Sequence, residues 1–110
     1  MEKVSVIVLT YNQETTIKRT IDSILNQQTT YPFKIYIGDD GSSDSTRLIC
    51  EEYVKNNADK IYLLPKAANK GVVKNYFDVL SYCNGDYVMA CAGDDWWHTP
   101  NKIQLQVDYM

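Results

Sequence analysis

The sequence lacks long hydrophobic runs and clusters of basic residues. Its first apolar segment, residues 4–9, is far shorter than the ~20 apolar residues of a membrane span, and polar sequence follows it at once. The eleven Lys and Arg residues are scattered and the formal net charge is -3, which argues against nucleic acid as a partner. We therefore expect a cytoplasmic chain without a signal peptide or transmembrane segment. In a longer parent protein, a peripheral position at the inner membrane face is the corresponding expectation.

Cysteine is also scarce. Cys50, Cys83 and Cys91 form no CxxC pair, and three is an odd number. Each lies in an apolar stretch, so we expect three small buried thiols in a reducing compartment rather than a disulfide or a zinc site.

Several catalytic motifs are missing. No GxxxxGK[ST] loop occurs, and no GxGxxG follows the first apolar run, which argues against a P-loop nucleotidase and a dinucleotide-binding enzyme. His98 is the single histidine and no GxSxG is present, so a Ser-His-Asp triad is not expected. We interpret His98 as a loop or packing residue.

What the sequence does contain is a regular alternation of two apolar patterns. Runs rich in β-branched residues predict strands at residues 4–9, 33–37, 61–64 and 87–91. Helical spacing predicts helices between them, at about residues 14–27, after the cap-prone run 42–46, at 73–83, and from Thr99-Pro100 onward. The third helix is expected to bury Val73, Tyr76, Phe77, Leu80 and Cys83. This order predicts one α/β domain, a parallel sheet with helices on its faces.

The last predicted helix reaches Met110 without a C-terminal glycine or a following strand. We therefore expect residues 1–110 to be one part of a longer domain. An incomplete sheet leaves an exposed edge, which predicts self-association into a homo-oligomer.

Two acidic pairs follow predicted strands. Asp39-Asp40 comes after the second strand and Asp94-Asp95 after the fourth. Because ligands bind at the carboxyl ends of parallel strands, we expect both pairs at one rim of the sheet, where a divalent Mg²⁺ or Mn²⁺ would offset their charge. Asp44 is interpreted instead as a cap of the second helix. Of the tandem Trp96 and Trp97, one ring is expected to be buried and the other to line the site.

Four strings in register resemble the family 2 glycosyltransferases of the GT-A fold. They are residues 4–12 (VSVIVLTYN), 38–44 (GDDGSSD), 69–71 (NKG) and 85–97 (GDYVMACAGDDWW) followed by Pro100. The resemblance covers nearly the whole chain. It implies a Rossmann-like, mostly parallel sheet and assigns residues 1–110 to the nucleotide-sugar-binding half of such a domain.

The resemblance also implies roles for single residues. Tyr11 matches the ring that packs on the base, Asp40 the carboxylate that accepts a hydrogen bond from it, and Asp39 a support for the loop or the ribose. Lys74 and Asn75 match an Arg-Asn pair near the nucleotide. The implied substrates are a nucleoside-diphosphate sugar, with uridine as the favoured base, and a saccharide or lipid-linked acceptor hydroxyl in polysaccharide or glycoconjugate synthesis.

The metal motif departs from the family pattern. Asp94 matches the last acid of the DxD motif, which binds the metal, and Asp95 is the usual extra acid, but the first acid is replaced by Ala92. The family's catalytic base lies in a later segment, so we expect the general base outside this chain. Two other functions remain open at this point. They are a sugar-phosphate nucleotidyltransferase and a non-catalytic module that binds nucleotides or glycans.

Overall fold

The computed structural model of the chain describes residues 2–109, which form four strands and four helices in strict alternation. The strands are β1 (Val4–Thr10), β2 (Phe33–Asp39), β3 (Ile61–Leu63) and β4 (Tyr87–Ala92). The helices are α1 (Ile17–Leu25), α2 (Thr46–Asn56), α3 (Val72–Leu80) and α4 (Lys102–Tyr109). The predicted α/β class is confirmed.

All strands are parallel, in the order β3-β2-β1-β4. The central strand β1 pairs with β2 from Val4 opposite Phe33 to Thr10 opposite Asp39, and with β4 from Val4 opposite Tyr87. Because the strands are parallel and in register, their carboxyl ends meet at one edge of the sheet. The loops that carry the acidic pairs start at that edge.

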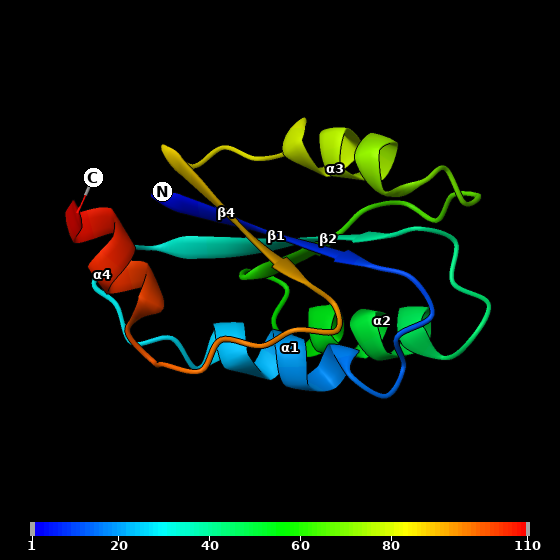
Figure 1. The fold of residues 1–110 in the computed structure, drawn as a ribbon, viewed down its shortest axis with the longest axis horizontal. Helices are drawn as coiled ribbons and strands as arrows, with labels where there is room; N and C mark the ends of the chain where they lie inside the picture. Colours follow the sequence, from blue (N-terminus) through cyan, green and yellow to red (C-terminus); the bar gives the residue numbers. More distant parts are fainter. Residues whose placement is uncertain (1, 110) are drawn as a thin grey trace.

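Helices cover both faces of the sheet, as the sequence predicts (Figure 1). On one face, alternate residues of β1 such as Val6 and Val8 pack against α1, α2 and α4 in the larger core cluster. Of the four described helices, α3 covers the other face, and its Val79 packs with Ile7 and Tyr36 in a smaller cluster. On this second face β4 is largely uncovered, and Val88 is 40% exposed.

The first helix begins later than predicted. α1 starts at Ile17 and not at Glu14, because residues 14–16 form a turn that is tied to the start of α2. The amide of Glu14 donates to Asp44 Oδ2 (3.3 Å), and the amide of Ser45 donates to Glu14 Oε1 (3.2 Å). The turn itself is closed by the amide of Thr16, which donates to the carbonyl of Gln13 (3.0 Å).

The predicted buried face of α3 is correct for Tyr76, Leu80 and Cys83, which pack partly buried against the smaller cluster, and wrong for the other two residues. Val73 and Phe77 are 67% and 61% exposed, whereas Asn75 and Val79 are buried. The physical reason is Gly38 on β2, which has no side chain and lets α3 approach the sheet through Asn75 and Val79.

The last helix also begins later than predicted, at Lys102 rather than at Pro100. The carbonyl of Pro100 accepts instead from the amide of Gln28 (2.5 Å), and the side chain of Gln27 accepts from the amide of Ile103 (2.9 Å). Contacts with the segment after α1 therefore decide where α4 begins.

Within residues 2–109, no helix combines the length and the apolar composition that crossing a bilayer requires. Cys50 and Cys91 are buried as predicted, and Cys83 is only half-buried.

Candidate functional site

A cavity of about 400 Å³ lies at the carboxyl ends of the strands, between α3 and β4. Its floor is apolar and includes Ile7, Leu9 and Ala90. Four of the predicted site residues line it, and each comes from a different segment: Tyr11, Asp40, Asn75 and Asp94. The sheet therefore brings together residues that lie up to 83 positions apart in the sequence.

Tyr11 stands at a tight turn directly after β1. The residue is 48% exposed, so part of its side chain is accessible to a ligand. The turn is held by Asn12, which has a positive φ of 49°. Its amide donates to Ser42 Oγ (2.8 Å) and its Oδ1 accepts from the amide of Ser43 (2.7 Å). Asn tolerates this backbone region better than most residues, because its side chain bonds locally.

Asp40 joins two of the rim loops. Its Oδ1 accepts from the amide of Lys70 (2.8 Å) and its Oδ2 from the amide of Gly71 (3.0 Å), just before α3. The amide group of Asn69 donates back to the Asp40 carbonyl (3.0 Å). A carboxylate oxygen can accept more than one hydrogen bond, so Asp40 keeps acceptor capacity for a ligand in the cavity.

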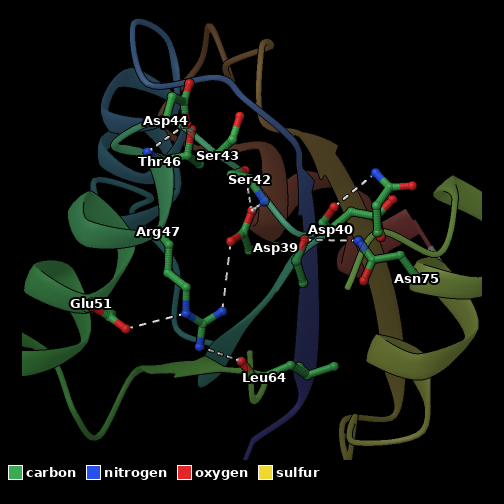
Figure 2. Close-up of polar contacts among 12 residues, drawn as sticks. Asp39, Asp40, Ser42, Ser43, Asp44, Thr46, Arg47, Glu51, Leu64 and Asn75 are labelled. Carbon is green, nitrogen blue, oxygen red and sulfur yellow. Dashed lines mark hydrogen bonds and ion pairs between the residues drawn. The ribbon is translucent and has the colours of Figure 1, made fainter. Parts of the chain in front are cut away.

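Asp39 points the other way. Its side chain is 2% exposed, does not line the cavity, and lies 3.8 Å from Nη1 of Arg47 on α2 (Figure 2). Its Oδ1 accepts from the hydroxyl and amide of Ser42. Adjacent residues at the end of a strand face opposite sides, so only one of the two aspartates can face the cavity.

The Lys74-Asn75 pair is divided in the same way. Asn75 is buried, lines the cavity and donates from Nδ2 to the carbonyl of Gly38 (3.0 Å). Lys74 is exposed on α3 and is not part of the cavity wall.

Of the second acidic pair, only Asp94 lines this cavity, next to Ala92. Asp95 Oδ1 accepts from the amide of Trp96 (2.8 Å), and Asp95 borders a separate cavity with His98 and Lys102. Among residues 2–109, no three His, Cys, Asp or Glu side chains gather in a group that could hold a metal ion. Of the two carboxylates that line the cavity, Asp40 is bound to the amides of Lys70 and Gly71, so Asp94 is the one left for a cation.

The tandem tryptophans behave differently from each other. Trp97 is buried in the larger core cluster, as expected for one of the two rings. Trp96 stacks on His98, with ring centroids 4.0 Å apart, and borders the second cavity rather than the one that contains Tyr11.

The cavity contains residues that the sequence pattern did not single out. Thr10 and Gln13 line it, and the Thr10 hydroxyl donates to Gln13 Oε1 (2.8 Å). Gly93 lies so close to both side chains that a Cβ there would overlap them. Cys91 also borders the cavity, and burial raises the pKa of its thiol to about 11, so it stays protonated at neutral pH. The position of Thr10 and Gln13 beside Tyr11 at a strand end was the available signal.

The sequence of the chain matches a profile of a known protein family. The profile described as Glycosyl transferase family 2 matches residues 5–110. The chain belongs to this family. The match favours a glycosyltransferase over the nucleotidyltransferase alternative.

Two similar proteins are described together with a nucleotide sugar. The Escherichia coli protein WfgD, a UDP-Glc:alpha-D-GlcNAc-diphosphoundecaprenol beta-1,3-glucosyltransferase, is 34% identical over 107 residues, which are 97% of this chain and 40% of WfgD. The solved structure of S. aureus TarS 1-349 in complex with UDP-GlcNAc is 31% identical, has a TM-score of 0.79, and is matched over 97% of this chain and 30% of that one.

A third protein shows likeness of fold alone. The mannosyltransferase PcManGT from Pyrobaculum calidifontis, solved with GDP-Man and Mn²⁺, has a TM-score of 0.87 at 23% identity, over 97% of this chain and 32% of that one. The chain spans between 31% and 40% of the length of curated relatives that are 34–37% identical to it. Its fold is that of the GT-A glycosyltransferases.

Proposed function

We propose that this chain forms the donor site of a metal-dependent glycosyltransferase. It would bind a nucleoside-diphosphate sugar, with a UDP-sugar as the favoured donor. The sugar would be transferred to an acceptor hydroxyl in polysaccharide or glycoconjugate synthesis. The observation that carries the proposal is the single cavity lined by Tyr11, Asp40, Asn75 and Asp94 in a member of this family. A volume of about 400 Å³ lies in the range of small-molecule sites.

The nucleoside would lie between the turn after β1 and the start of α3. The half-exposed ring of Tyr11 offers a stacking surface for the base. Asp40 is held in place by two backbone amides and can accept a further hydrogen bond, which suits an N–H of the base. Uridine is the proposed base, since both the name of WfgD and the TarS complex contain a UDP-sugar.

The diphosphate would lie toward β4. Mg²⁺ and Mn²⁺ are commonly held by one or two carboxylates together with substrate phosphate oxygens. The exposed carboxylate of Asp94 fits that pattern, while Ala92 contributes no second ligand and Asp95 is turned to the amide of Trp96. A divalent ion bound there would neutralise the charge that develops on the departing diphosphate.

The residues of this chain would therefore bind and orient the donor. Asn75 is locked to Gly38 and forms a fixed wall of the cavity, and the apolar floor keeps the sugar end out of bulk water. Asp40 and Asp94 are assigned here to the nucleotide base and the metal, and His98 is stacked on Trp96 outside the cavity, so we propose that the general base lies outside the described residues. The acceptor is proposed to be a saccharide or a lipid-linked saccharide, as in the name of WfgD.

Isothermal titration of the chain with UDP, GDP and CDP, each with and without Mn²⁺, tests this function. We expect UDP to bind most tightly and Mn²⁺ to strengthen its binding. If none of the three nucleotides binds under either condition, the donor-site proposal is wrong. Transfer of radiolabelled sugar from UDP-sugars to glycan acceptors then separates an enzyme from a module that only binds.

A further inference from the structure

A buried ion pair lies beneath the rim loop that follows β2, outside the cavity. The guanidinium of Arg47 reaches from α2 to the ends of two strands (Figure 2). Its Nη1 lies 3.8 Å from Asp39 Oδ2, and its Nη2 donates to the carbonyl of Leu64 (3.1 Å). The side chains of Arg47 and Asp39 are 15% and 2% exposed, whereas the third partner, Glu51, is 52% exposed.

The buried ion pair is expected to add little to the stability of the fold. Charges lose hydration when they are buried, and apolar side chains of similar size often serve stability equally well. The Nε and Nη1 atoms of Arg47 are buried and make no hydrogen bond, although they lie close to carboxylates. A pair of this kind is better explained by what it holds in place.

A chain of contacts leads from the pair to the cavity. Asp39 Oδ1 accepts from the hydroxyl and from the amide of Ser42. With its hydrogen committed to Asp39, Ser42 Oγ presents a lone pair to the amide of Asn12 (2.8 Å). Asn12 in turn accepts from the amide of Ser43 (2.7 Å). The positive-φ turn at Asn12 is therefore held by Asp39, and this turn directs the ring of Tyr11.

We propose that Asp39 and Arg47 are positioning residues for the Tyr11–Asn12 turn, and that they tune nucleotide binding without touching the nucleotide. Arg47 holds the Asp39 carboxylate, Asp39 orients the Ser42 hydroxyl, and Ser42 holds the turn. The part of this inference that concerns binding rests on the proposed donor site. The part that concerns the turn does not.

Amide hydrogen exchange of the ligand-free chain tests the turn. In Arg47→Met, the amides of Asn12 and Ser43 should exchange about tenfold faster or more, since each loses a fixed acceptor. The amide of Asn75 in α3 donates to the carbonyl of Gly71 and serves as the reference. Its exchange should accelerate only as far as the loss of global stability requires. Glu51→Gln is the matched control, because it removes only the exposed partner of Arg47. Equal acceleration at Asn12, Ser43 and Asn75 would overturn the proposal.

Titration of the same variants with UDP tests the consequence. Arg47→Met and Asp39→Asn should each weaken UDP binding by about tenfold or more, the effect of losing a charge-assisted contact, and Glu51→Gln should leave it unchanged. The double variant, Asp39→Asn with Arg47→Met, separates positioning from stability. It should melt at a higher temperature than Arg47→Met, since no unpaired charge stays buried, yet still bind UDP weakly.

If the double variant has both the UDP affinity and the melting temperature of the wild type, the pair only stabilises the fold and the inference is wrong. If the wild-type chain binds no UDP, the donor-site proposal fails, and the exchange of Asn12 and Ser43 still decides whether the pair holds the turn.

Discussion

The side-chain amide of Asn75 donates to the carbonyl of Gly38 at 3.0 Å, and this contact determines how α3 lies on the sheet. A Cβ at residue 38 would come within 2.7 Å of Asn75 Oδ1 and would overlap Cγ2 of Val79. The absence of a side chain at one strand position thus fixes a helix, and with it one wall of the cavity.

Gly38→Ala should therefore destabilise the chain by about 1–3 kcal/mol, the usual cost of an inserted methyl group in a packed core. Urea denaturation followed by circular dichroism measures it. Because Val79 is buried and β-branched, it has little freedom to move aside. An unchanged midpoint would mean that α3 is not held at Gly38.

The buried face of α3 can be tested by two substitutions on the same helix. Val79→Ala removes two buried methyl groups and should cost about 2 kcal/mol. Phe77→Ser alters a side chain that is 61% exposed and should change the free energy of unfolding by no more than about 0.5 kcal/mol. A larger loss of stability in Phe77→Ser than in Val79→Ala would mean that α3 buries the face that contains Phe77.

The α3 segment also shows where sequence reasoning reached its limit. Strands such as β1 were predictable, because a short, almost continuous β-branched run is typical of a strand covered on both faces. In α3, apolar residues occupy two faces at helical spacing. The choice between those faces is made by Gly38, more than thirty residues away in the sequence, and no local pattern contains that information.

The site was predictable to a similar extent. Parallel strands bring their carboxyl ends to one edge, so the convergence of Asp40 and Asp94 on one cavity follows from the order of elements. Which member of each acidic pair faces the cavity depends on the backbone direction at a single residue. That direction turns Asp39 toward Arg47 and Asp95 toward the amide of Trp96, and spacing alone does not reveal it.

Asp40→Ala should weaken UDP binding even without metal, because the proposed partner of Asp40 is the base and not the diphosphate. The loss of a hydrogen bond to a charged group corresponds to about 10- to 150-fold in affinity. Part of this loss arises from the freed amides of Lys70 and Gly71. Asp40→Asn keeps an acceptor but not the charge, so its UDP affinity should lie between those of wild type and Asp40→Ala. Equal metal-free affinity of wild type and Asp40→Ala in calorimetry would remove Asp40 from the site.

The buried thiols predict a pH dependence. Burial raises the pKa of Cys50 to about 12 and that of Cys91 to about 11, and burial also raises the pKa of Cys83. A thiol in the unfolded chain ionises near ~8.5, so the unfolded state loses its protons first as pH rises. Stability should therefore be constant below about pH 8 and fall progressively between about pH 9 and 12.

The same thiols predict a labelling order. At pH 8, iodoacetamide should label the half-buried Cys83 before Cys50 and Cys91, which mass spectrometry of peptides can resolve. Rapid labelling of Cys50 in the native chain would contradict its burial.

The most direct test of the donor site compares two adjacent carboxylates. Calorimetric titration with UDP, with and without Mn²⁺, is carried out on wild type, Asp94→Asn and Asp95→Asn. Asp94 lines the cavity and Asp95 borders a separate one, so the two variants remove the same charge at adjacent positions and only one of them alters the proposed site. We predict that Asp94→Asn abolishes the gain in UDP affinity that Mn²⁺ provides and leaves the fold intact, while Asp95→Asn keeps most of that gain. An Asp94→Asn chain that binds UDP with unchanged affinity and unchanged dependence on Mn²⁺ would contradict the account.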